Sequence, residues 1–201
     1  MSQFALPLDW PAQHDERDFI VTDTNRLVVR HLDHCSVWPV MATWLTGPRK
    51  SGRSLIGRIF AARSGGTLID DAERADEEAI FHAWNRAQAD RRPLLMIADA
   101  APPEWKIRLP DLRSRLSATP HVAIGLPDDA LAGALAEKLL IARGLAPPSD
   151  LGRYLLTRIE RSYVGILRAV DAIDEAALAR RQRITLPLVK RALESMGVID
   201  E

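Results

Sequence analysis

One loop, residues 47–54 (the phosphate loop), has the spacing found in loops that bind nucleotide phosphates. It follows an apolar run and precedes a helical pattern, so its backbone N–H groups and the helix N-terminus would face an anion. Arginine stands where such loops carry lysine, and its planar fork does not replace an ammonium group that reaches between two phosphates. We expect nucleotide binding without rapid hydrolysis, and the alternative is a glycine-rich turn that caps a helix. The candidate nucleotide-binding residues of this loop are Gly47, Lys50, Gly52, Arg53 and Ser54, of which Ser54 would also ligate Mg²⁺.

Carboxylates end two apolar runs that follow the phosphate loop. In GTLIDD, Asp70 would hold Mg²⁺ through water and Asp71 would orient an attacking water. In PLLMIAD, Asp99 would sense a terminal phosphate. Acidic residues are also ordinary at strand ends and in turns. Their order after the phosphate loop is what favours a nucleotide site.

The elements that would position these residues show two different sequence patterns along the chain. From residue 18 to about 126, short apolar runs alternate with helical patterns, which indicates a mostly parallel sheet with helices on its faces. From residue 127 the strand signals stop, and a helix that begins after Asp128 or Asp129 and stops at Gly144 is followed by helices at about 149–160, 162–180 and 186–197. We therefore predict a tail (1–17), an α/β core (18–126) and a small all-helical domain (127–201).

Composition narrows the class of protein. The 201 residues carry 27 basic and 27 acidic side chains, so general attraction to nucleic acid is not indicated. The single cysteine, Cys35, excludes an internal disulfide, and neither a secretory leader nor an apolar run long enough to cross a bilayer is evident. We expect a cytoplasmic protein that does not contact membranes.

Three weaker patterns favour ordinary structure. The spacing of His31, His34 and Cys35 resembles part of a metal site, but three or four converging ligands are needed, and a polar helix end is the preferred interpretation. The basic segment 179–183 around Arg180 would contact a phosphate backbone or, in our preferred interpretation, form a solvated helix end. The tryptophans at 38, 44 and 84 are interpreted as core residues.

A family resemblance covers almost all of residues 18–197. It rests on these segments, in this order: DFIVTDTNRL, WLTGPRKSGRSLIG, LIDDAER, FHAWNR, LLMIADAAPPEW, LPDLRSRL, PDDALAGALAEKL, GRYLLTRIERS and ITLPLVKRAL. The chain resembles the AAA+ module of the bacterial replication initiator DnaA, and more closely the Hda group of short DnaA homologues that lack the DNA-binding domain. The resemblance implies a P-loop AAA+ core with a helical lid. It also implies a regulator that binds the DNA polymerase sliding clamp, promotes hydrolysis of the ATP held by DnaA and prevents re-initiation.

The resemblance assigns further residues. Arg115 matches the arginine finger that acts on a neighbour's ATP, and Ile20 and Val21 match a stretch that covers adenine. At the N-terminus, the family's clamp-binding peptide is matched by Gln3, Phe4, Leu6, Pro7 and Leu8. A homodimer fits the habit of AAA+ modules to work across subunit interfaces, and direct sequence-specific DNA recognition is not expected.

Two departures from the family pattern bear on turnover. Val164 occupies the position of the sensor arginine in the lid, and only 15 residues separate Ser54 from Asp70, where the family usually inserts another strand and helix. We therefore expect a sheet of about four strands. The sequence leaves two outcomes open for the nucleotide site: weak binding of ADP or ATP with Mg²⁺, or no binding of nucleotide. A regulator that acts through its partner is preferred, and a self-sufficient AAA+ ATPase that acts on DNA or replication complexes is the alternative.

Overall fold

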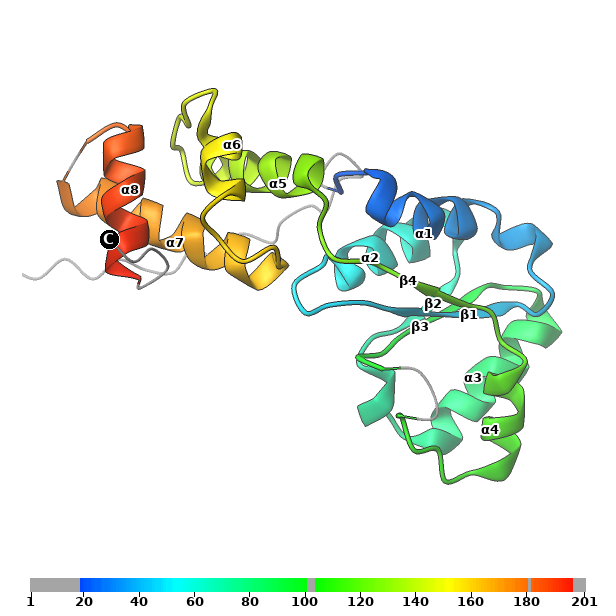
Figure 1. Cartoon of the computed structure of the whole chain (residues 1–201). Coiled ribbons are helices and arrows are strands. Elements are labelled where there is room, and N and C mark those ends of the chain that lie inside the picture. Colours follow the sequence, from blue (N-terminus) through cyan, green and yellow to red (C-terminus); the bar gives the residue numbers. More distant parts are fainter. Residues whose placement is uncertain (1–18, 101–103, 181, 197–201) are drawn as a thin grey trace, which may run out of the picture.

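The fold is built on a parallel four-stranded sheet with the strand order β2-β3-β1-β4 (Figure 1). The computed structural model describes residues 19–100, 104–180 and 182–196. The strands are β1 (Ala42–Thr46), β2 (Thr67–Ile69), β3 (Leu94–Ile97) and β4 (His121–Ala123). In the register, Trp44 of β1 lies opposite Met96 on one side and His121 on the other. The predicted parallel sheet of about four strands is confirmed.

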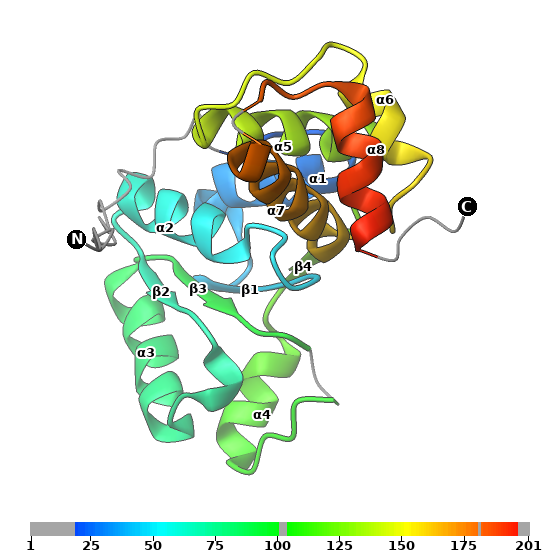
Figure 2. The same ribbon diagram turned by 90° about the vertical axis from the view of Figure 1, so that its left-hand side faces the viewer.

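Helices cover both faces of this sheet (Figures 1 and 2). On one side lie α1 (Asp23–Asp33) and α2 (Arg53–Ser64), and on the other lie α3 (Glu77–Asp90) and α4 (Pro110–Ser117). Because side chains alternate across a strand, the central strands β1 and β3 divide their residues between two apolar cores. Trp44 and Met96 pack with α3 and α4, whereas Leu45 and Ile97 pack with α1 and α2.

The strand β2 forms one edge of the sheet and pairs with β3 alone. Thr67 is exposed, Leu68 and Ile69 are partly buried, and the strand leads into a short 3-10 helix, η3 (Ala72–Arg74). Gly66 is required just before β2, because a Cβ there would lie 2.4 Å from the Pro93 carbonyl oxygen. Because the strands are parallel, the carboxyl ends of β1, β2 and β3 lie on the same side of the sheet.

Four helices follow β4: α5 (Asp129–Ala142), α6 (Leu151–Leu156), α7 (Tyr163–Arg180) and α8 (Leu186–Ser195). They share one apolar cluster and form a lid beside the sheet (Figure 1). The predicted starts of two of them are confirmed, since Asp128 caps α5 by accepting the Leu131 N–H at 2.7 Å and Thr185 is the N-cap of α8. The predicted extent of α6 was too long, because this helix ends at Leu156 and the Thr157 hydroxyl donates to the Tyr154 carbonyl.

The lid is joined to the sheet layer by apolar and polar contacts. Leu131 of α5 and Tyr163 of α7 belong to the apolar cluster that includes α1 and α2. The Tyr163 hydroxyl donates to the Gly125 carbonyl at 3.1 Å, and Thr24 of α1 donates to the Asp128 carboxylate at 3.0 Å. Burial, aided by the nearby Asp128 charge, raises the pKa of Tyr163 to about 12.

The histidine and tryptophan residues that we interpreted as ordinary structure contact neighbouring side chains. Trp38 and Trp44 are buried and Trp84 is half-buried, as predicted. The His31 ring stacks on Trp38 at 4.9 Å between centroids, and its Nε2 hydrogen-bonds the Thr43 hydroxyl at 2.8 Å. Among the described residues, no group of three or more His, Cys, Asp or Glu side chains could hold a metal ion.

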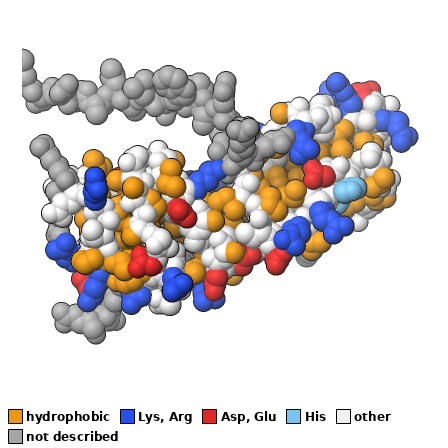
Figure 3. Space-filling model, turned by 90° about the horizontal axis from the view of Figure 1, so that it is seen from above, with side chains coloured by type: hydrophobic (Ala, Val, Ile, Leu, Met, Phe, Trp, Pro, Cys, Tyr) orange, Lys and Arg blue, Asp and Glu red, His pale blue; other side chains and the backbone are white. Residues whose placement is uncertain are grey.

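Charge is mixed over the surface. Seen from above, basic and acidic side chains are interspersed with hydrophobic ones over the same face (Figure 3). No helix in the part of the chain that the structure describes is long and apolar enough to span a bilayer. In the basic segment near the end of α7, Arg183 is exposed, and the side chains of Arg180 and Arg181 lie outside the described residues.

Candidate functional site

The phosphate loop connects β1 to α2 and has the backbone shape of an anion cradle. Three of its residues have positive φ: Gly47 at 156°, Lys50 at 66° and Gly52, the N-cap of α2, at 87°. A Cβ on Gly47 would lie 3.0 Å from Ile124, and one on Gly52 would lie 3.2 Å from the Phe19 ring. The Ser51 hydroxyl is buried and has no hydrogen-bond partner within the described part of the chain. The loop therefore keeps the shape and the spare polar group that suit a bound anion.

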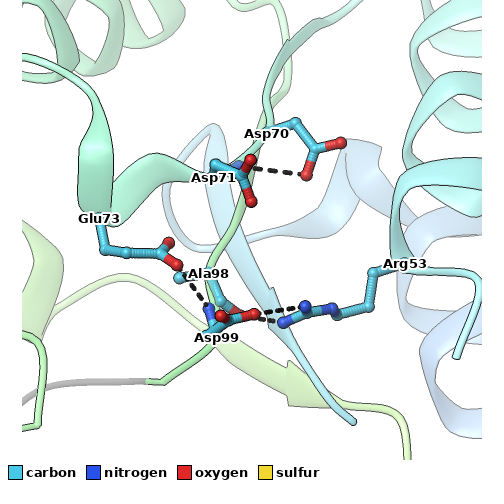
Figure 4. Close-up of polar contacts among 6 residues, drawn as sticks. All are labelled: Arg53, Asp70, Asp71, Glu73, Ala98 and Asp99. Atoms are coloured by element: carbon cyan, nitrogen blue, oxygen red, sulfur yellow. Dashed lines mark hydrogen bonds and ion pairs between the residues drawn. The ribbon is translucent and has the colours of Figure 1, made fainter. Parts of the chain in front are cut away.

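Arg53, which stands at the usual lysine position of this loop, is already paired within the chain (Figure 4). The Arg53 side chain is 12% exposed and crosses from α2 to the end of β3, where Nη2 donates to the Asp99 carboxylate at 2.5 Å. Its Nη1 donates to the Ala98 carbonyl at 2.6 Å. The hydrogen bond from Arg53, with added attraction from its charge and from Arg49 and Arg74, lowers the pKa of Asp99. The sequence placed both residues at a nucleotide site but not in contact with each other.

The other predicted carboxylates lie at the end of β2. Asp70 and Asp71 are exposed, and the Asp71 N–H donates to the Asp70 carboxylate at 3.1 Å. Neither contacts Arg53 (Figure 4). Ser54, the other predicted Mg²⁺ ligand, lies half-buried in the first turn of α2. Glu73 was missed: one of its carboxylate oxygens accepts the Asp99 N–H at 3.3 Å, and the other is buried without a partner among the described residues.

The predicted adenine-proximal residues lie just before α1. Ile20 is half-buried, and its carbonyl accepts a hydrogen bond from the Asn25 side chain at 2.8 Å. Val21 is 49% exposed and, with Phe19, lines one end of an apolar cavity of about 390 Å³ between α1 and α2. Phe19 is also the residue that lies on Gly52. This segment therefore borders the phosphate loop, as the prediction requires.

Arg115, the predicted arginine finger, is held by neutral groups of α3 and α4. Its Nε donates to the Asn85 side chain at 3.1 Å, and its Nη1 donates to the Asp111 carbonyl at 3.2 Å. The guanidinium carbon lies 4.5 Å from the centre of the Phe81 ring and 5.4 Å from that of Trp84. Nη2 makes no hydrogen bond within the described part of the chain, and no described carboxylate forms an ion pair with Arg115.

Arg115 lies on the side of the sheet where the strands start, and the phosphate loop lies on the side where they end. Arg115 is in the last turn of α4, which ends shortly before β4 starts, whereas the phosphate loop follows the carboxyl end of β1 (Figure 1). In a parallel sheet the starts of all strands share one edge and their ends share the other. The Arg115 guanidinium therefore lies away from the phosphate loop of its own chain.

The position predicted for the sensor arginine lies in the lid helix α7. Val164 is half-buried in the first turn of α7. Arg161 precedes this helix and pairs with Asp129 at 3.3 Å, and Arg168 is exposed one turn beyond Val164. The predicted clamp-binding residues, Gln3, Phe4, Leu6, Pro7 and Leu8, lie outside the described residues.

Comparison with known proteins identifies the lid and the fold. Residues 134–193 match the family model described as "Hda, lid domain". The chain is similar to domain III of the replication initiator DnaA from Thermotoga maritima, with a TM-score of 0.68 and 12% identity over 92% of this chain and 97% of that one. It is similar also to AMPPCP-bound DnaA from Aquifex aeolicus, with a TM-score of 0.60 and 16% identity over 78% of this chain and 63% of that one.

A second group of solved structures has the same fold. The Holliday junction branch migration motor RuvB of Thermotoga maritima has a TM-score of 0.66 and 12% identity over 90% of this chain and 72% of that one. The predicted fold class, an α/β AAA+ core with a shortened parallel sheet and a small helical lid, is confirmed. The resemblance to Hda is confirmed for residues 134–193, and the resemblance to DnaA is confirmed for the fold.

Proposed function

We propose that this Hda- and DnaA-like AAA+ chain is a regulator of chromosomal replication initiation that binds the DNA polymerase sliding clamp and promotes hydrolysis of the ATP held by DnaA. The observation that carries the proposal is the match of residues 134–193 to the Hda lid domain, on a core with the fold of DnaA domain III. The chain would act through its partner's nucleotide site.

The environment of Arg115 supports a role in trans. Asn85 and the aromatic rings of α3 fix the direction of the guanidinium and leave Nη2 unpaired within the described chain. A guanidinium inserted into a neighbour's ATP site stabilises the charge that develops on the transferred phosphoryl group, an effect of roughly 10³–10⁵ in rate. Because its partners on this chain are neutral, Arg115 would bring a full positive charge to that site.

The N-terminal segment would attach the chain to the clamp. Gln3 would supply amide hydrogen bonds, Leu6 and Leu8 would fill apolar pockets, and Phe4 would stand where the family usually has leucine. Pro7 restricts the free peptide and so reduces the entropy lost on docking. Two separate surfaces, the tail for the clamp and Arg115 for DnaA, would then work together.

The phosphate loop gives this chain a candidate site for ADP or ATP. The residues fit in part: the backbone of Gly47, Lys50 and Gly52 forms a cradle for phosphates, whereas Arg53 is paired with Asp99. Ser54 and Asp70 are the residues that would hold Mg²⁺. A bound nucleotide would supply phosphates to fill the cradle, and the proposed regulation requires no turnover there.

A reconstituted hydrolysis assay tests the proposal. ATP-loaded DnaA is mixed with clamp on primed DNA, with or without the chain, and the chain is also assayed alone. We expect hydrolysis only in the full mixture, and loss of both clamp binding and stimulation when residues 1–9 are deleted. Replacing Asp9 by Asn in the intact tail is the matched control and should change neither. Robust ATP hydrolysis by the chain alone would instead support the self-sufficient ATPase.

A further inference from the structure

A carboxylate of the chain itself is bound to Arg53, the residue at the usual lysine position of the phosphate loop. Asp99 accepts from Nη2 and the neighbouring Ala98 carbonyl accepts from Nη1, so both terminal nitrogens of Arg53 are engaged. Only 12% of the Arg53 side chain is exposed, which leaves little of it for an external anion. A phosphate could reach this cation only by displacing Asp99.

Carboxylates lie beside the cations of this part of the site. The Asp99 carboxylate is attracted by the charges of Arg53, Arg49 and Arg74, and Asp70, Asp71 and Glu73 lie nearby (Figure 4). An incoming polyphosphate would therefore meet acidic side chains as well as basic ones. Two anions that compete for one guanidinium repel each other, which disfavours simultaneous binding of both.

The backbone of the loop has nevertheless kept its anion-binding shape. The positive φ values of Gly47, Lys50 and Gly52 hold the turn open at the N-terminus of α2, and the buried Ser51 hydroxyl has no partner among the residues that the structure describes. Among these carboxylates, Asp99 is the one bonded to Arg53, so it opposes phosphate binding most directly. Neutralising that carboxylate should be enough to let phosphates in.

We propose that Asp99 is the resident anion of the phosphate loop, which keeps the loop formed without a nucleotide and weakens the binding of nucleoside di- and triphosphates by competing for Arg53. This inference concerns the chain's own nucleotide site. It stands or falls independently of clamp binding and of DnaA regulation, so the two tests are distinguishable.

Calorimetric titration of the full chain with ADP–Mg²⁺ and with ATP–Mg²⁺ tests it. We expect a Kd of about 1 mM or weaker for the unaltered chain and binding tighter by about tenfold or more for Asp99→Asn. Glu78→Gln is the matched control, because Glu78 lines the same groove as Asp99 and is exposed, yet makes no contact with Arg53. This control should bind as weakly as the unaltered chain.

Tight nucleotide binding by the unaltered chain overturns the inference, and so does an Asp99→Asn chain that folds and gains nothing. An equal gain in Glu78→Gln would also overturn it, since general electrostatics would then be the cause. If Asp99→Asn does not fold, NMR of the Arg53 guanidinium in the unaltered chain decides. Its resonances, assigned with Arg53→Lys, should stay unchanged on titration with inorganic phosphate and ADP, and a saturable shift at low concentration refutes the proposal.

Discussion

Two arginines of this chain are held by their neighbours in different ways. Arg53, in the phosphate loop, is bound by the Asp99 carboxylate and a backbone carbonyl. Arg115, in α4, is bound by an amide side chain, a backbone carbonyl and two aromatic rings. Both guanidiniums have a fixed direction, but only Arg53 has a counter-charge.

The comparison separates positioning from neutralisation. A carboxylate partner fixes a guanidinium and cancels its field, whereas amide and aromatic partners fix it and leave the charge in place. A cation that must act on another molecule needs the second kind of environment. Of these two arginines, only Arg115, which lies away from the phosphate loop, has no carboxylate partner among the described residues.

The largest expected effect follows from removing the available charge. Arg115→Ala should lower the stimulated hydrolysis of DnaA-bound ATP by about a hundredfold or more, because a transition-state contact is lost. The measurement is the turnover of ATP-loaded DnaA with clamp on DNA. Arg113→Ala is the control on the same helix, since Arg113 donates to the Ile107 carbonyl instead, and it should stay within about twofold. Equal losses in both variants would contradict the role of Arg115.

Replacing the Asn85 amide by a carboxylate would give Arg115 the kind of partner that Arg53 has. Asn85→Asp places a carboxylate on the Arg115 Nε, so stimulated hydrolysis should fall by about tenfold while the protein becomes no less stable. Activity and thermal unfolding are measured together. General damage would lower both, whereas neutralisation lowers activity alone. Undiminished activity would show that the neutral environment of Arg115 is unimportant.

The ion pair of Arg53 should contribute modestly to stability. Arg53→Ala should reduce the free energy of unfolding by about 1 kcal/mol, because half of the Asp99 side chain is exposed and solvent screens the pair. The comparison variant is Arg161→Ala, whose pair with Asp129 has side chains 65% and 60% exposed and should contribute about 0–0.5 kcal/mol. Denaturant unfolding measures both, and a smaller loss for Arg53→Ala would contradict the difference.

Acid should remove the contribution of Asp99 to stability. The pKa of Asp99 is lowered from 3.8 in the folded chain, so its contribution is complete above that value and is lost as pH falls through the lower, folded pKa. The difference in unfolding free energy between the unaltered chain and Asp99→Asn should therefore be constant from about pH 7 to 5 and shrink below about pH 4. A gap that shrinks already near neutral pH would point to another group.

Much of the fold is readable from local pattern. Alternating apolar runs and helical segments predicted the sheet, and the short interval between Ser54 and Asp70 predicted that it has four strands. Cap residues Asp128 and Thr185 located two lid helices. The end of α6 was misjudged because Thr157 bonds to a carbonyl of the preceding turn, a local choice that apolar spacing does not report.

The candidate site could be predicted only in part from the sequence. The sequence predicted that Arg53 and Asp99 belong to one site, because the ends of the strands in a parallel sheet lie on the same side. It could not predict that Arg53 and Asp99, 46 residues apart, would pair with each other, since this depends on β3 lying next to β1. The partners of Arg115 were also missed, although Phe81 and Asn85 are four apart and so share one face of α3.

The shortened sheet also has a consequence for solubility. With β2 as its outer strand, the sheet exposes a row of backbone N–H and C=O groups that another chain could extend, and such rows promote aggregation. Here the strand is only three residues long, follows two glycines and ends at Ile69, and two residues later the φ of 50° at Asp71 turns the backbone out of line. The acidic pair Asp70–Asp71 adds negative charge at the same end. We therefore expect these two residues, predicted for chemistry, to disfavour pairing of β2 with a strand of another chain.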